Sequence, residues 1–390
     1  MVARKKNAPR ITDVTSSSAG WRPNGCERVA MVLQGGGALG AYQAGVYQAL
    51  HENGMEPDWV SGVSIGGINS AIIAGNKPED RLPRLRDFWE TISGRKVWSF
   101  TPDGDVFRKV RNASSSLMAM LHGQPGFFAP RHVNPWLSHA GGDASTSFYD
   151  TAPLKETLLR LVDFDLLNNG PVQFAVGAVN VTSGNFVYFD NRFTVIEPEH
   201  IMASGALPPA LPMVEINNAQ YWDGGIVSNT PLAHLLDRED KLNTLVIQVD
   251  LFSAKGKVPN DMPEVLARHK DIMYSSRTRA NTDSYRKLRN WKNIALAALS
   301  KIPASKLDNQ EKKLLEDLST LPDITLLQLI YQQQSHEGHS KDYDFSGTSM
   351  REHWTTGYED TRKIFEKPEL LEMPPKGSGI TVHDVRREIE

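Results

Sequence analysis

The stretch of sequence that decides the fold is residues 59–74, which read WVSGVSIGGINSAIIA. Its first five residues predict a buried strand, and residues 67–74 predict a helix. Ser64 stands between these two segments and is flanked by Gly62 and Gly66. A serine between two glycines at a strand-to-helix corner is typical of a nucleophile elbow, because the small neighbours allow close backbone contacts and strained dihedral angles. The Ser64 hydroxyl is then expected at a helix end where the dipole favours developing negative charge.

The bulk composition is that of a globular protein. The chain has 390 residues, of which 40% are hydrophobic and 23% charged, and this predicts one large α/β domain with additions. A net charge of −3 gives no bulk attraction to nucleic acid, so no nucleic-acid partner is expected. The single cysteine, Cys26, excludes an internal disulfide and a cysteine-rich zinc site.

The N-terminal residues and the hydropathy of the chain predict a cytoplasmic protein. Residues 1–25 are basic and then polar, lack the apolar core of a secretory signal, and predict a disordered tail. No stretch approaches the roughly eighteen apolar residues that a membrane span needs, which leaves only peripheral attachment to a membrane.

The order of elements before Ser64 predicts a parallel sheet with helices on its faces. Residues 28–33 read as a buried strand that runs into the glycines at 35–37. Leu39, Tyr42, Val46 and Leu50 then recur at spacings of three and four, which indicates a helix. Together with the strand and helix around Ser64, this is a β-α-β-α order.

The remaining segments divide the chain. A catalytic domain is predicted over 28–250, because further strands are expected at 172–178, 186–189, 221–225 and 244–249. An accessory region is predicted over 251–366, with a helical insertion at 253–320 and a late strand near 324–330 that completes the sheet. Residues 367–390 carry prolines and glycines and predict a loose tail.

Two further motifs accompany the elbow. Residues 35–40 read GGGALG, and bare backbone N–H groups there suit an oxyanion hole; the candidate residues are Gly35, Gly36, Gly37, Ala38 and Gly40. The second motif is Asp223-Gly224-Gly225, followed by Asn229. A carboxylate on a tight glycine turn can reach a serine across the end of the sheet and act as its base.

With all three motifs in this order, residues 28–250 resemble the patatin-like phospholipase family. The stretch 203–208, ASGALP, also looks like a motif of that family. The resemblance implies a three-layer α/β fold and a lipid acyl hydrolase of the phospholipase A or lysophospholipase kind. It implies Ser64 as nucleophile, Asp223 as general base, a covalent acyl-enzyme, and neither metal nor cofactor. The sequence departs from the family at Leu39, where a lysine or arginine is usual.

Other readings of the same residues stay open. An acyltransferase or a thioesterase would use the same acyl-serine. The glycines at 35, 37 and 40 also fit an NAD(P) fingerprint, but the acidic residue expected at the end of the second strand is absent and Asp58 precedes that strand. A Ser-His-Asp triad would need His234 or His269, neither of which lies in a recognisable motif. A binding protein that kept the fold without turnover is the last alternative.

One segment outside the motifs predicts a surface contact. Residues 268–292 are basic, and Trp291, Ile294, Leu296 and Leu299 lie at or beyond their end. A basic helix with an apolar side can lie on an anionic membrane, which would suit an enzyme that acts on lipids. The alternative is a solvated helix that packs on the core.

Overall fold

The computed structural model describes residues 21–94, 121–139, 141, 145–237, 240–275, 278–334, 337–338 and 340–385. The described strands form a central mixed sheet in the order β11-β10-β9-β1-β2-β5-β8-β7, with β6 also paired to β5. The parallel strands are β1 (Arg28–Leu33), β2 (Trp59–Val63), β5 (Gln173–Asn180), β9 (Thr244–Asp250), β10 (Ile324–Ile330) and β11 (Ile380–Asp384). The antiparallel strands are β6 (Phe186–Asp190), β7 (Val214–Ile216) and β8 (Ala219–Asp223). A separate small ladder pairs β3 (Ala129–Pro130) with β4 (Tyr149–Asp150).

Helices connect and cover these strands. The α-helices are α1 (Ala41–Glu52), α2 (Ile65–Ala74), α3 (Pro78–Ser93), α5 (Ala152–Leu161), α6 (Phe164–Asn169), α7 (Pro198–Ser204), α8 (Leu232–Leu236), α9 (Met262–Tyr274), α10 (Thr278–Leu299), α11 (Asn309–Ser319) and α12 (Gly347–Phe365). Short 3-10 turns that bear on the site are η1 (Gly37–Gly40), η2 (Pro135–Leu137), η4 (Gly224–Ile226) and η6 (Lys341–Tyr343).

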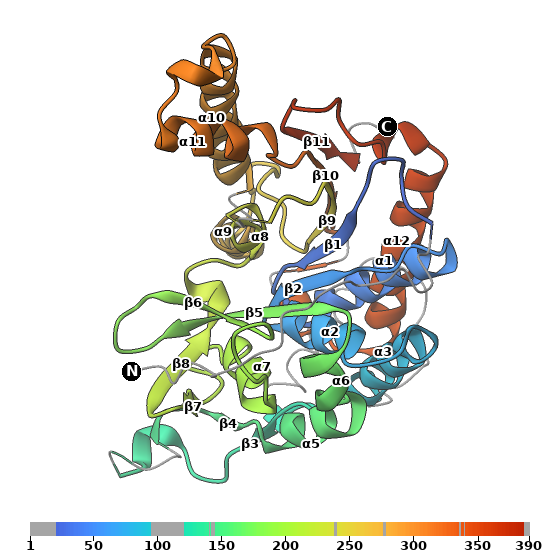
Figure 1. Ribbon diagram of the computed structural model, residues 1–390. Helices are drawn as coiled ribbons and strands as arrows, with labels where there is room; N and C mark the ends of the chain where they lie inside the picture. Colours follow the sequence, from blue (N-terminus) through green and yellow to red (C-terminus); the bar gives the residue numbers. More distant parts are fainter. Residues whose placement is uncertain are drawn as a thin grey trace.

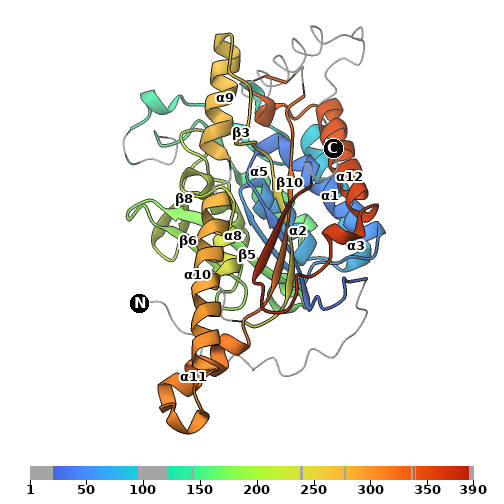
Figure 2. The same cartoon turned by 90° about the horizontal axis from the view of Figure 1, so that it is seen from above.

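The side chains of the central strand β1 show how the layers form. Val29, Met31 and Leu33 face a large apolar cluster that includes residues of α1, α2, α3 and α12. Ala30 and Val32 face the opposite way, into a smaller cluster built with α8. Both faces of the sheet are therefore buried, as the continuous apolar runs predict. Figures 1 and 2 show the resulting three layers, which confirm the predicted α/β fold class.

The region after residue 250 is built into the sheet more deeply than the sequence indicates. β10 occupies the position of the late strand near 324–330 and pairs in parallel with β9. The predicted loose tail over 367–390 needs correction, because β11 lies within it and pairs with β10 from Ile324↔Ile380 to Gln328↔Asp384. β11 is a short strand at the sheet edge and includes polar residues, so it lacks the apolar run that marks a buried strand.

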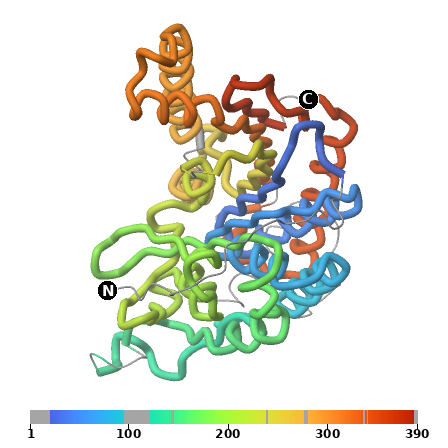
Figure 3. Tube along the Cα trace, viewed as in Figure 1, coloured from blue at the N-terminus to red at the C-terminus, as the bar shows by residue number. Residues whose placement is uncertain are grey.

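The N-terminal residues and the helical insertion lie outside the central sheet. Within the predicted tail 1–25, Trp21 packs edge-on against Phe365 of α12, whereas residues 1–20 lie outside the described residues. The insertion expected over 253–320 contains α9, α10 and α11. The α10–α11 hairpin projects away from the sheet (Figure 3). In the described ranges, no helix is long and apolar enough to cross a membrane.

Strand register places the elbow and the aspartate motif side by side. Val63, which precedes Ser64, pairs with Gly177 of β5. On the other side of β5, the next residue, Ala178, pairs with Asp223 at the end of β8. Because β8 runs antiparallel to β5, its last residue lies level with the first residue after β2. The sheet therefore brings two motifs together that are 159 residues apart in sequence.

Candidate active site

Ser64 forms the predicted strand-to-helix corner in a strained conformation. It has φ 55° and ψ −124° and directly precedes α2. Its N–H donates to the Ser204 hydroxyl at 2.9 Å and lies 3.1 Å from the Ser204 carbonyl oxygen. A side chain on Gly66 would collide with the backbone of Leu33, and one on Gly62 would collide with Gly66. The two glycines therefore let the corner close, and strain of this kind is typical of functional sites.

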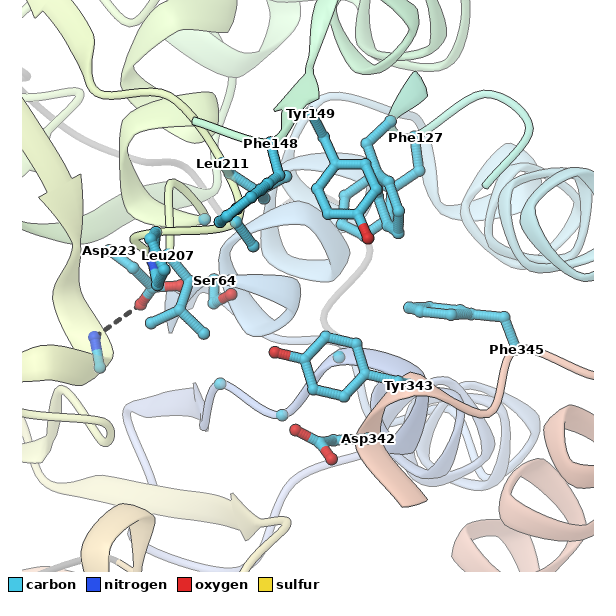
Figure 4. A pocket seen from close by; sticks show the side chains of 18 of the residues that line it. Ser64, Phe127, Phe148, Tyr149, Leu207, Leu211, Asp223, Asp342, Tyr343 and Phe345 are labelled. Atoms are coloured by element: carbon cyan, nitrogen blue, oxygen red, sulfur yellow. Dashed lines mark hydrogen bonds between the residues drawn. The ribbon is translucent and has the colours of Figure 1, made fainter. Parts of the chain in front are cut away.

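Asp223 lies at the end of β8 and is only 3% exposed. Its Oδ1 accepts a hydrogen bond from the Gly225 N–H at 2.7 Å, so the turn that follows holds the carboxylate (Figure 4). Burial raises the pKa of Asp223 to about 7, although the Gly225 N–H and the Ser64 side chain, as hydrogen-bond donors, act to lower it. Desolvation wins because a charged carboxylate loses more hydration than two donors return. The group is poised to exchange a proton near neutral pH.

The segment 204–206 ties these two residues together. Ser204, at the end of α7, accepts from the Ser64 N–H, and the Ala206 carbonyl accepts from the Asp223 N–H at 3.0 Å. Ser204 is fully buried. The sequence marks this stretch as a motif but gives no role for it; the structure shows that it fixes the backbone of both residues.

The glycine-rich loop, residues 35–40, lies beside Ser64, but only some of its residues line the pocket. The Gly35 N–H donates to the Asn229 carbonyl at 3.2 Å, so this amide is already engaged. Gly36 and Gly37 lie in the pocket wall, whereas Ala38 and Gly40 are buried and do not line it. Gly37 has φ 53°, and a side chain there would collide with the Asp342 carbonyl. Gly36 and Gly37 are thus the loop glycines that line the pocket and whose N–H groups donate to no acceptor among the described residues.

Asn229 holds the loop, the aspartate turn and α9 in register. Its side-chain amide donates to the Gly35 carbonyl and to the Tyr274 carbonyl, each at 3.0 Å. The turn itself is tight: a side chain on Gly224 would come within 2.7 Å of the Gly177 carbonyl oxygen, and one on Gly225 within 3.0 Å of the Asp223 carboxylate. The two turn glycines are therefore required by packing.

Ser64 and Asp223 open into a pocket of about 610 Å³. This volume is typical of small-molecule sites. Figure 4 shows Ser64 and Asp223 at one end of the pocket, with aromatic side chains at the other. The aromatic end is built from three segments: Phe127 packs on Phe345 with ring centroids 5.9 Å apart, and Phe128 packs on Tyr149 at 4.9 Å. Further apolar lining comes from Phe148, Leu207 and Leu211.

The accessory region supplies a polar wall that the sequence analysis missed. Lys270 of α9 and Asp342 of η6 form an ion pair at 2.7 Å, and the Lys270 ammonium lies 5.0 Å from the Tyr343 ring centroid. All three residues line the pocket. Burial raises the pKa of Asp342 even though Lys270 lowers it. No motif marks these residues, because they approach Ser64 only through the fold.

Leu39, the position that departs from the family pattern, is fully buried in the main core. Behind the same loop lies a buried ion pair between His353 and Glu337, with Nε2 and Oε1 2.6 Å apart. Burial alone would lower the pKa of His353, but Glu337 raises it, and the Ala38 carbonyl acts in the same direction. α12 thereby places the His353 imidazole next to the glycine-rich loop, and Glu337 favours its protonated form.

The residues that a catalytic triad or a dinucleotide site would need lie outside the pocket that contains Ser64. His234 contacts Asp190 at 3.0 Å and stacks on Tyr188, and neither His234 nor His269 lines the pocket. Asp58, considered for a dinucleotide site, accepts from Arg22 at 2.6 Å and from the Val29 N–H at 2.8 Å. In the described part of the chain, no group of three or more His, Cys, Asp or Glu residues is arranged to hold a metal ion.

The basic segment 268–292 does not form one solvated stripe. Arg268 donates to the backbone carbonyls of Ser253 and Ala254. Lys270 belongs to the pocket wall, and Arg289 is 5% exposed and pairs with Asp323 at 3.3 Å. Only part of the positive charge is therefore available to an external partner.

Comparison with known proteins supports one family for both parts of the chain. The sequence profile of the patatin-like phospholipase family matches residues 31–236, and a second profile, described as patatin phospholipase, matches residues 272–377. Together they contain Ser64 and Asp223 as well as Asp342 and Tyr343 of the pocket wall.

Individual relatives resemble the chain more distantly. Lysophospholipase NTE1 of Candida glabrata is 27% identical over 60% of this chain and 11% of its own length. Lysophospholipase NTE1 of Saccharomyces cerevisiae is 25% identical over 62% of this chain and 12% of its own length. The chain therefore spans about a ninth of the length of these relatives. Among solved structures, VipD from Legionella pneumophila aligns with a TM-score of 0.39 and 16% identity, over 96% of this chain and 78% of VipD.

The first profile alone covers more than half of the chain and contains the glycine-rich loop, the elbow and the aspartate turn. The resemblance predicted from these motifs is confirmed. The chain belongs to the patatin-like phospholipase family.

Proposed function

We propose that the protein is a serine acyl hydrolase of lipid esters that works through Ser64 and Asp223. The observation that carries this proposal is a buried carboxylate with a pKa near 7 that lies beside a strained serine at the end of an apolar pocket. A general base is most effective when its pKa lies near the working pH. Membership in a family of lipid acyl hydrolases agrees with this chemistry.

In the proposed first step, ionised Asp223 takes the proton of the Ser64 hydroxyl as its oxygen attacks the ester carbonyl carbon. The negative charge on the carbonyl oxygen is held by backbone amides of Gly36 and Gly37, with the dipole of α2 adding to the field. Protonated Asp223 then returns its proton to the departing alcohol. This leaves an acyl group on Ser64 and a neutral leaving group.

In the second step, Asp223 accepts a proton from water as the water oxygen attacks the acyl carbonyl. Collapse of the second tetrahedral intermediate releases the fatty acid, and the proton on Asp223 passes to Ser64. The two half-reactions use one base and one nucleophile, which is the usual logic of covalent acyl transfer.

The pocket supports a lipid as substrate. Its far end is lined by Phe127, Phe128 and Phe345, which provide an apolar surface for an acyl chain. Its polar wall includes Lys270 and Asp342. Asp342 lies on another side of Ser64 than Phe127 (Figure 4). Two matched relatives bear the name lysophospholipase, so a lysophospholipid is the first substrate to test.

The test is hydrolysis of p-nitrophenyl esters of increasing chain length, followed by a lysophosphatidylcholine. Wild type is compared with Ser64→Ala and Asp223→Asn, and each variant is checked by circular dichroism. Both variants are expected to lose at least a thousandfold in kcat while folded, since base and nucleophile act as a unit. An Asp223→Asn enzyme that retains most of its activity would refute the dyad.

Transfer of the acyl group to an acceptor other than water is the alternative chemistry. An acyltransferase or thioesterase would form the same acyl-Ser64, so the variants do not separate these activities. Product analysis with an added alcohol or lysolipid acceptor does: free fatty acid as the main product supports the hydrolase. A peripheral contact with a lipid surface is also part of the proposal. Within segment 268–292, the exposed Arg286 and Lys287 of α10 are available for it.

A further inference from the structure

α9 is a surface helix with its apolar side turned outward. Its exposed residues include Met262 (67% exposed), Leu266 (48%) and Met273 (52%), together with Val265 and Ile272. These positions follow the helical repeat and define one face. The opposite face carries buried Ala267 and Asp271, with Asp271 paired to Lys341. Surface helices normally place the apolar side against the core, and an exposed apolar face of this kind is typical of a surface that binds a partner.

The inner side of the same helix reaches the active-site pocket. Lys270 and Tyr274 line that pocket, and the exposed Ile272 and Met273 lie between them in sequence. One helix turn therefore presents lining groups inward and apolar groups outward. The apolar face of α9 begins at the pocket wall and continues along the helix toward Met262.

Two other segments of the pocket wall also lead into exposed apolar residues. Val133 lines the pocket and is 51% exposed, and it leads into Trp136 and Leu137 of η2, which are 85% and 81% exposed. Beyond the lining residue Gly225, the next residues Ile226 and Val227 are 46% and 48% exposed. Apolar groups thus extend outward from the pocket on several sides.

We propose that these segments form one docking surface for a lipid bilayer, here called the mouth surface: residues 133–137, residues 226–227 and the apolar face of α9. Viewed from above, α9 and the segment around β3 lie at the same end of the molecule (Figure 2), and Figure 1 shows them apart along the other direction. The occupant follows from continuity, because the surface surrounds the opening of an apolar pocket whose proposed substrate is itself a membrane component. Trp136 fits the membrane–water boundary, where indole rings concentrate. The proposal rests on the proposed lipid hydrolase activity.

Vesicle binding by apolar insertion and vesicle binding by electrostatic attraction depend differently on the salt concentration. Binding through the mouth surface persists at high ionic strength, whereas binding through the exposed Arg286 and Lys287 of α10 is screened. The mouth surface is therefore expected to bind vesicles of zwitterionic phosphatidylcholine in 0.5 M NaCl.

The experiment uses two variants of the mouth surface and one matched control. Trp136→Gln with Leu137→Gln changes the loop, and Leu266→Gln with Met273→Gln changes α9. The control is Leu288→Gln with Trp291→Gln on α10, whose residues are similarly exposed, at 53% and 69%. Glutamine keeps helix propensity, and exposed sites tolerate the exchange. Each protein is assayed by co-sedimentation with phosphatidylcholine vesicles and by hydrolysis of a short, monomeric p-nitrophenyl ester.

Both mouth-surface variants are expected to lose at least tenfold in vesicle affinity and to keep wild-type rates on the monomeric ester, while the control binds as wild type does. Wild-type vesicle binding in both mouth-surface variants would overturn the proposal, and so would loss of binding in the control alone. Light scattering that shows a wild-type dimer broken by these variants would assign the surface to a second copy instead. An inert wild type on the monomeric ester would refute the proposed function, whereas sedimentation reports on docking independently.

Discussion

The buried Asp223 carboxyl should make the protein less stable as the pH rises, and Asp223→Asn should remove this effect. The folded-state pKa of about 7 lies above the ordinary value of 3.8, because burial disfavours the charged form. Between these two values the folded state holds a proton that the unfolded state has released. Stability from this group is therefore fully present below about pH 4 and is lost as the pH rises to about 7.

The size of the effect follows from the pKa difference. Each pKa unit corresponds to about 1.36 kcal/mol, so a shift from 3.8 to about 7 amounts to about 4 kcal/mol over the whole range. Between pH 5 and pH 8, where the fold is easiest to study, about 3 kcal/mol of this change remains. Asparagine keeps an oxygen that can accept from Gly225 but carries no charge to bury. The stability of Asp223→Asn relative to wild type should rise by that amount.

Urea denaturation of both proteins at pH 5, 6, 7 and 8 measures the difference directly. Asp165→Asn removes one carboxylate from the surface of α6 and controls for the change in net charge. A stability difference between Asp223→Asn and wild type that stays constant from pH 5 to pH 8 would refute the argument. Such a result would mean that the carboxylate is solvated in the folded protein and is not held poised beside Ser64.

Three further outcomes follow from the same geometry. The kcat/KM for a soluble ester should reach half of its plateau at about pH 7 and fall to about a tenth of the plateau at pH 6, since the base must be ionised; a flat profile from pH 5.5 to 8 contradicts this. Gly37→Ala should lower kcat at least tenfold because its side chain meets the Asp342 carbonyl, whereas Gly184→Ala, which has a similar φ of +68° and open space, should leave kcat unchanged; equal losses would implicate backbone strain alone. Glu337→Gln should lower the free energy of unfolding by about 3–5 kcal/mol, because it removes the negative charge that pairs with buried His353; a loss below about 1 kcal/mol in urea titrations would show that this charge does not stabilise the fold.

Much of the site could be predicted from the sequence because its chemistry lies in short local motifs. The elbow around Ser64 and the turn at 223–225 each combine a reactive side chain with glycines that packing requires. Their meeting across β5 depends on an antiparallel pairing that no local pattern reveals. The sequence also does not distinguish the roles of the residues in the glycine-rich loop. Only the fold shows that the Gly35 N–H donates to the Asn229 carbonyl and that Ala38 and Gly40 do not line the pocket.

The contribution of the accessory region could not be predicted for a different reason. Lys270, Asp342 and Phe345 reach the pocket through long-range packing of isolated residues that carry no spacing signal. β11 was missed because an edge strand with polar residues looks like a loop. α9 has clear helical periodicity, but periodicity alone does not tell which face is buried, and here the apolar face is the exposed one.

Covalent capture of Ser64 tests the central claim most directly. The protein is incubated with an alkyl fluorophosphonate, digested and examined by mass spectrometry. One adduct per chain on Ser64, which is absent after pretreatment with a slowly hydrolysed ester substrate, is the predicted result. Ser61 and Ser70 lie in the same stretch and are 1% and 0% exposed, so they serve as internal controls. An unmodified Ser64, or an adduct on another residue in a folded protein, would contradict the account.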